Sequence, residues 1–276
     1  MTARAATVWF IDSPDPAGDL RAAVHPAPDD SGNPLPRHDV GRAQQLASTI
    51  YGDSVLVPLV DTDLATAAAA RDHHVYAGFY GPLAVISCSL FETTTPSMLT
   101  RTLAAIRPSS VATLLHVDPD TAFGAFARWE QGTLRRSFSA DPVTIHEDQG
   151  LPFTFERPFW AGEFPIPFTE RFAAQPMALP FHPGQLAEEA NRDWLGFRFT
   201  HPFSPTDLDP ASIPVTCFAL HPAEYEPTPE DFEAYRAANA ARNGRRGVER
   251  HDVEIGEPGP ERGRRRKGRI RAYFGF

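Results

Sequence analysis

The residues best suited to catalysis lie at the predicted ends of two strands. Asp12 ends one apolar run and His116 ends another, and Asp118 and Asp120 follow His116 directly. If the two strands are neighbours, their ends would bring together several carboxylates and one imidazole. Such donors suit Mg²⁺ or Mn²⁺. One hypothesis is therefore a divalent-metal-dependent hydrolase, with Asp12 and His116 as catalytic candidates and Asp12, Asp118 and Asp120 as candidate metal ligands.

The same acids have a simpler explanation. Asp and Pro alternate after Asp12 and after His116, and both types form turns, Asp through its side chain and Pro through its fixed φ. We favour turn formation at these positions and assign no cofactor. His73 and His74 precede a predicted strand, and we interpret them as its half-exposed entry rather than as a site.

A second candidate is the Phe- and Pro-rich stretch 150–203, which holds ten of the 20 Phe residues. Its rings would line a ligand pocket or a peptide groove, with Arg157, Phe159, Trp160 and Glu163 as the groove candidates. The alternative is that most of the rings fill the core, since each buried aromatic removes about 150–250 Å² from water. We call this stretch the aromatic arm.

A third candidate is the basic C-terminus. Residues 245–276 contain ten Arg and Lys against five Asp and Glu, a balance of +5, whereas the whole chain carries −9. Residues 1–244 therefore carry −14. The tail resembles arms that neutralise phosphates, which makes nucleic-acid association a further alternative that the acidic body opposes. Its candidate residues are Arg264, Arg265, Arg266, Lys267 and Arg269.

Several protein classes lack their signatures in this chain. It has no P-loop, no GxGxxG after a strand, no GxSxG, no HExxH and no CxxC pair. No apolar run reaches the roughly 18 residues of a membrane span, and the N-terminus does not look like a signal peptide. We expect a cytoplasmic protein without membrane contact. Cys88 and Cys217 each lie in an apolar run and are predicted to be buried free thiols.

The elements that position these candidates indicate an α+β fold with a mostly antiparallel sheet; a doubly wound parallel fold is the alternative. Pro58 argues for an edge position of its strand. Residues 13–37 are predicted as a loop. Apolar runs predict strands at 7–12, 54–60, 74–80, 83–89, 111–116, 122–129, 133–140 and 215–220, and periodicity predicts helices at 38–50, 62–71, 97–106, 184–195 and 228–243.

The predicted organisation is one core domain at 1–222, which includes the aromatic arm, a C-terminal helix at 223–244, and a disordered basic tail at 245–276. In the helix at 184–195, Leu186, Ala190 and Trp194 share an apolar face. Glu188 and Glu189 are predicted to face solvent.

Motifs in the predicted hairpin at 122–140 and in the aromatic arm resemble those of a known family. The segment Trp129-Glu130-Gln131-Gly132 is followed by Trp160-Ala161-Gly162-Glu163 and Pro180-Phe181-His182-Pro183, with Val75-Tyr76-Ala77-Gly78 earlier in the chain. Together these resemble an uncharacterised actinobacterial family, a domain of unknown function, over roughly residues 6–220. The resemblance implies a cytoplasmic bacterial protein and carries no activity. The stretch near 13–36 and everything after about 225 depart from the family pattern.

The sequence leaves the function unknown and its enzyme status open. The favoured hypothesis is a non-catalytic binding or interaction protein that uses the aromatic arm or a groove, with a protein or a small molecule as partner. The metal-dependent hydrolase and nucleic-acid association remain the alternatives.

Overall fold

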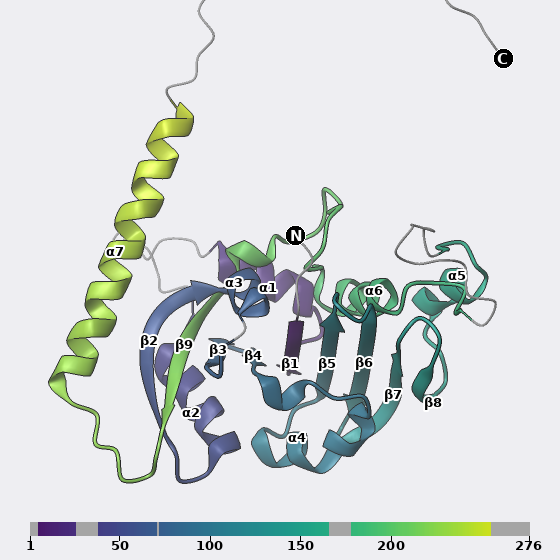
Figure 1. Ribbon diagram of the computed structural model, residues 1–276, viewed down its shortest axis with the longest axis horizontal. Coiled ribbons are helices and arrows are strands. Elements are labelled where there is room, and N and C mark those ends of the chain that lie inside the picture. The colour runs from purple at the N-terminus through teal and green to yellow at the C-terminus, as the bar shows by residue number, and fades with distance from the viewer. Residues whose placement is uncertain (1–4, 26–37, 71, 166–177, 255–276) are drawn as a thin grey trace, which may run out of the picture. The chain divides into compact units, whose positions relative to one another are not determined.

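The fold is built on one nine-stranded antiparallel sheet. A computed structural model describes residues 5–25, 38–70, 72–165 and 178–254, with side chains up to residue 242. The strand order is β2-β9-β3-β4-β1-β5-β6-β7-β8 (Figure 1). Every strand pair in the sheet is antiparallel. The chain is therefore α+β with a mostly antiparallel sheet, as predicted.

The strands are β1 (Ala5–Ile11), β2 (Val55–Asp63), β3 (Val75–Tyr80), β4 (Leu83–Ser87), β5 (Val111–Asp118), β6 (Phe123–Glu130), β7 (Thr133–Ala140), β8 (Ile145–Gly150) and β9 (Pro214–His221). The helices are α1 (Pro16–Val24), α2 (Val40–Tyr51), α3 (Leu64–Ala69), α4 (Thr100–Ile106), α5 (Arg157–Trp160), α6 (Pro183–Leu195) and α7 (Pro229–Glu254). Short 3₁₀ turns include Ser89–Phe91, Pro96–Leu99 and Thr154–Glu156.

Both faces of the sheet carry a hydrophobic core. Alternate residues of β1 divide between them, because successive side chains of a strand point to opposite faces. Trp9 lies in the core beneath α1, α3 and α6, whereas Phe10 lies in the core beneath α2 and α4. The sheet is thus covered by helices on both sides.

Local sequence signals account for most elements. The hairpin of β6 and β7 turns at Gln131 and Gly132, which both have positive φ. Strand β2 pairs with β9 alone among the described strands, so the edge position that Pro58 indicates is confirmed. The strand register shifts between Pro58 and Val60, in keeping with the missing backbone donor of proline.

One prediction of irregular chain was wrong, and one strand was not predicted. Residues 16–24, predicted as loop, form α1, because the Asp15 carboxylate accepts a hydrogen bond from Gly18 N at 3.0 Å and Pro16 occupies the first helical turn. Leu20 and Val24 then bury one face of this helix. Strand β8 was not predicted, since its sequence IHEDQG is polar; it forms by pairing with β7.

The C-terminal helix begins near the predicted residue but continues to Glu254. The first ten residues of the predicted disordered tail are therefore helical, and Gly244 does not end the helix. By compactness the chain divides into residues 1–238 and 239–276. The tail candidates Arg264, Arg265, Arg266, Lys267 and Arg269 lie outside the described residues. Within the described part, no helix combines the length and apolar character that a membrane crossing requires.

Candidate functional site

The strand-end acids do not meet around a common centre. Strand β1 runs antiparallel to β5, with Ala6 opposite His116 and Ile11 opposite Val111. Asp12 lies six positions beyond Ala6, so about 20 Å of strand separates it from His116. The prediction required the two C-terminal strand ends to share one edge, which an antiparallel pair excludes.

Each predicted residue has a local partner instead. Asp12 accepts hydrogen bonds from Ser110 N at 2.7 Å and from Arg107 Nη2 at 2.9 Å. His116 Nδ1 lies 3.2 Å from the carbonyl oxygen of Thr93. Asp118 accepts a bond from Asp120 N at 3.0 Å, a turn contact. Among the described residues, no group of three His, Cys, Asp or Glu side chains is placed to hold a metal ion.

The aromatic arm contributes mainly to the core. Phe159 is 5% exposed, and its ring lies 5.9 Å from the ring of the fully buried Phe181. Trp160, by contrast, is 36% exposed, and Arg157 and Glu163 are exposed. Phe159 thus contributes to the core while the other three side chains are exposed, and a groove formed by these four residues stays a prediction.

A buried ion pair fastens the arm to the sheet. The guanidinium of Arg136 on β7 binds the Glu156 carboxylate through Nε at 3.0 Å and Nη2 at 2.8 Å, and both side chains are fully buried. Asp148 on β8 also contacts Arg136. Sequence reasoning missed this pair, because its members are 20 residues apart and follow no motif.

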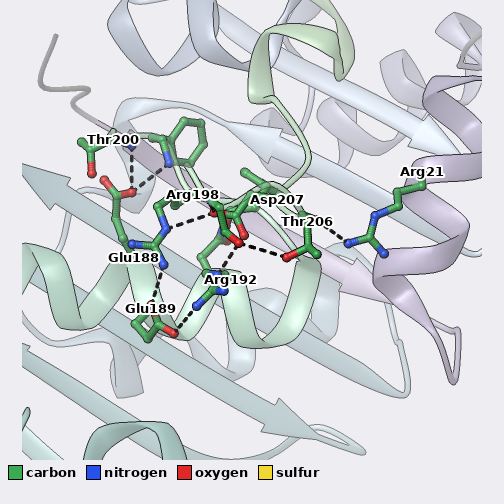
Figure 2. A network of polar contacts seen from close by, with 12 residues as sticks. Arg21, Glu188, Glu189, Arg192, Arg198, Thr200, Thr206 and Asp207 are labelled. Carbon is green, nitrogen blue, oxygen red and sulfur yellow. Dashed lines mark hydrogen bonds and ion pairs between the residues drawn. The ribbon is translucent and has the colours of Figure 1, made fainter. Parts of the chain in front are cut away.

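A second polar network holds the chain after α6 (Figure 2). Arg192 contacts Glu189 and Asp207 at 2.9 Å each. Arg198 contacts the same two acids, at 2.8 and 3.5 Å. Since each charge in this group has an opposite charge beside it, the network fixes the segment that leads from α6 towards β9. We interpret it as structural.

The strongest candidate for a ligand site is a polar cavity of about 220 Å³, which we call the Asp72 cavity. It lies where the start of β1, the end of α3, the start of β3 and the end of β4 meet. Alanines of α3 and β1 form part of its wall. The polar lining residues used below are Asp72, His73, His74, Tyr76, Ser87 and Glu92.

Asp72 is the centre of a hydrogen-bonded group at this cavity. Its carboxylate accepts from the Tyr76 hydroxyl at 2.8 Å and from His74 N at 3.1 Å, and its Oδ2 lies 3.0 Å from His74 Nδ1. Burial acts to raise the pKa of Asp72, but the bonds from Tyr76 and His74 outweigh it and hold that pKa below its ordinary value. Asp72 therefore stays ionised at neutral pH.

The nearby thiols are protonated at neutral pH. Burial raises the pKa of Cys88, which lines the cavity, and raises that of Cys217, which contacts Tyr76, to about 11. Both cysteines are free and buried, as predicted. Because the thiolate is the reactive form, neither thiol suits nucleophilic chemistry.

Asp72 orients His74, and an imidazole held through Nδ1 can accept a proton at Nε2. Among the described residues, however, no hydroxyl or thiol hydrogen-bonds to His74 Nε2. The arrangement offers a fixed carboxylate and imidazole to the cavity. The sequence signal for it was the pair His73-His74, interpreted only as the entry to a predicted strand, and Asp72 was not singled out.

Comparisons of the chain with known proteins agree with the resemblance to a family of unknown function. No curated protein and no solved structure matches the chain. A family model matches residues 5–218, which extend from β1 into β9 and include the Asp72 cavity. The chain belongs to DUF6928, a family of unknown function.

Proposed function

We propose that this chain is a binding protein for a small, positively charged polar molecule, held in the Asp72 cavity. The observation that carries the proposal is an ionised carboxylate at a polar cavity, fixed in place by Tyr76 and His74. A preformed cavity with a few fixed polar groups is the usual form of a small-molecule site.

The charge of the cavity selects the ligand class. Asp72 and Glu92 line it, and acidic side chains favour a positively charged ligand. A primary ammonium group would donate to Asp72, while Ser87 and Tyr76 offer hydroxyls to polar atoms of the same ligand. The volume of about 220 Å³ is below the roughly 300–1,000 Å³ of pockets for drug-sized molecules, so the ligand is smaller than these.

Binding accounts for the geometry better than catalysis does. The thiols at and beside the cavity are protonated, and His74 holds no nucleophile among the described residues. The proposal keeps the binding class that the sequence favoured. It moves the site from the aromatic arm to the Asp72 cavity, since the rings of the arm largely fill the core.

The test is a titration of the full chain with ethylammonium, followed through the backbone amide resonances of His74 and Tyr76. We expect saturable shifts with ethylammonium and none with acetate. Asp72→Asn should weaken binding about tenfold or more, since a hydrogen bond to a charged group contributes about 1.5–3 kcal/mol. The amide keeps an oxygen for His74 N, and its NH2 can donate to the Tyr76 hydroxyl oxygen, so the fold should persist.

Asp53→Asn is the matched control, because Asp53 is exposed after α2 and does not line the cavity. It should bind ethylammonium as the parent chain does. Equal affinities of the parent and the Asp72→Asn variant would contradict the proposal, as would shifts that do not saturate at His74 and Tyr76.

A further inference from the structure

A cavity with charged walls lies between α1, α6 and the chain that follows α6. It has a volume of about 360 Å³, within the range of small-molecule sites. We call it the Arg21 cavity. The lining residues used below are Arg21, Glu189, Arg192, Asp193, Gly196 and Thr206.

Arg21 places a cation at this cavity where a ligand can reach it. The residue is exposed, and its Nη2 donates a hydrogen bond to the carbonyl oxygen of Thr206 at 2.9 Å (Figure 2). A Cβ added to Gly196 would lie 3.2 Å from the same Nη2, so the guanidinium lies beside the backbone of this glycine. The bond to Thr206 uses one of five N–H donors. Since Arg21 has no carboxylate partner among the described residues, its other donors are available to a ligand.

Asp193 places an anion at the same cavity. It is exposed on α6, and in the described part of the chain its carboxylate has no hydrogen-bond or ion-pair partner. Partial burial and the negative charge of Glu189 raise the pKa of Asp193 above its ordinary value. A cationic group bonded to this carboxylate would stabilise its ionised form.

The remaining charges around the cavity balance one another. Arg192 and Arg198 each contact both Glu189 and Asp207, so that two cations face two anions. This leaves Arg21 and Asp193, one group of each sign, and these two do not form an ion pair with each other. A ligand with a single charge would satisfy only one of them, whereas a zwitterion would satisfy both.

We propose that the Arg21 cavity binds a small zwitterion with one carboxylate and one ammonium group, as in an amino acid. The carboxylate accepts from the Arg21 guanidinium, and the ammonium group donates to Asp193. Both protein groups are exposed, so a ligand reaches them without any rearrangement of the core. This site is separate from the Asp72 cavity and does not depend on the function proposed for it.

The probe is γ-aminobutyrate, and butyrate and butylammonium are the counter-probes, since each has the same carbon chain but only one of the two charges. The full chain is titrated with each, and binding is followed through the backbone amide resonances of Gly196 and Thr206. We expect saturable shifts with γ-aminobutyrate and binding weaker by about tenfold or more with each counter-probe, because each lacks one charged hydrogen bond. The resonances of His74 and Tyr76 report any binding at the Asp72 cavity and so distinguish the two sites.

Two variants each remove one of the charges. Arg21→Gln should lower the affinity for γ-aminobutyrate to about that for butylammonium, and Asp193→Asn should lower it to about that for butyrate. Both residues are exposed, so the fold should persist. Arg101→Gln and Asp53→Asn are the matched controls, because both residues are exposed and neither lines the cavity. The controls should bind γ-aminobutyrate within about twofold of the parent chain.

Three results would overturn the proposal. The first is the absence of saturable shifts at Gly196 and Thr206 with γ-aminobutyrate. The second is binding of butyrate or butylammonium as tight as that of γ-aminobutyrate, since one charge would then suffice. The third is an affinity of Arg21→Gln or Asp193→Asn equal to that of its matched control.

Discussion

Glu188 shows how much a single buried carboxylate contributes to this fold. It was predicted to face solvent from α6, and that prediction was wrong: it is 3% exposed. Its Oε2 accepts hydrogen bonds from Phe199 N at 2.8 Å and from Thr200 N at 3.0 Å. The carboxylate thereby supplies acceptors to a turn of chain that has returned against the helix (Figure 2). Its neighbour Glu189 has the more exposed position and pairs with Arg192 and Arg198.

The burial of Glu188 predicts a pH dependence of stability. Burial raises the pKa of Glu188 above its ordinary value, although Phe199 and Thr200 donate to it. The folded chain therefore binds this proton more tightly than the unfolded chain. Stability relative to Glu188→Gln should fall as the pH rises from about 4.3 through the raised pKa. Denaturant unfolding of both chains between about pH 4 and pH 8 measures this difference.

Glu224→Gln serves as the control, because Glu224 is exposed between β9 and α7. The same denaturant series on this variant gives the baseline with which the Glu188→Gln difference is compared. A difference between the parent and Glu188→Gln that does not change with pH would contradict the assignment of a raised pKa.

At the scale of elements, α6 packs against β6 through glycine. A Cβ at Gly124 would lie 2.3 Å from the carbonyl carbon and oxygen of Pro183 and 2.5 Å from Gly184 N. These are backbone atoms of the first turn of α6, so no side-chain rotation can make room. The helix approaches the strand this closely because Gly124 lacks a Cβ.

This contact predicts the effect of a single methyl group. Gly124→Ala should destabilise the chain by about 1–3 kcal/mol or more, since the helix must move away from the sheet. Gly41→Ala in α2 is the comparison: its nearest contact would be ordinary, at 3.5 Å, and it should be stabilising by about 0.5–1 kcal/mol. Urea midpoints of the two variants test this. Equal effects of the same sign would contradict the packing argument.

At the scale of the whole molecule, the last strand of the chain, β9, lies inside the sheet and not at its edge. Strand β9 follows every other strand in the chain but lies between β2 and β3. Val215 and Phe218 of β9 are fully buried, on opposite faces of the sheet. Among the described strands β2 pairs with β9 alone, so β9 joins this edge to the remainder.

A pair of truncations tests this role and the predicted domain boundary. A chain that ends at residue 213 lacks β9, and we expect it not to fold cooperatively. A chain that ends at residue 222 keeps β9 and should show a cooperative thermal transition, with circular dichroism of a mixed α and β protein. Cooperative folding of the shorter chain would contradict the role assigned to β9, and failure of the longer chain would show that later residues are required.

The sequence by itself determined the local structure and the class of the fold. Apolar runs and turn residues predicted the eight strands other than β8 and the hairpin at Gln131-Gly132, because these signals act between residues close in the chain. Pro58 indicated an edge strand, since proline lacks the backbone donor. The motifs of the hairpin and arm also indicated a family of unknown function, and the chain belongs to one.

Only the tertiary structure decided which residues meet. Strand order and direction depend on the packing of the whole chain, so the sequence could not show that Asp12 and His116 lie at opposite ends of an antiparallel pair. The same holds for Glu188, buried by a segment that follows its helix. The Asp72 cavity forms where the start of β1, the end of α3, the start of β3 and the end of β4 meet. Patterns of neighbouring residues cannot predict such contacts. The free energy of packing arises between residues that are distant in the chain.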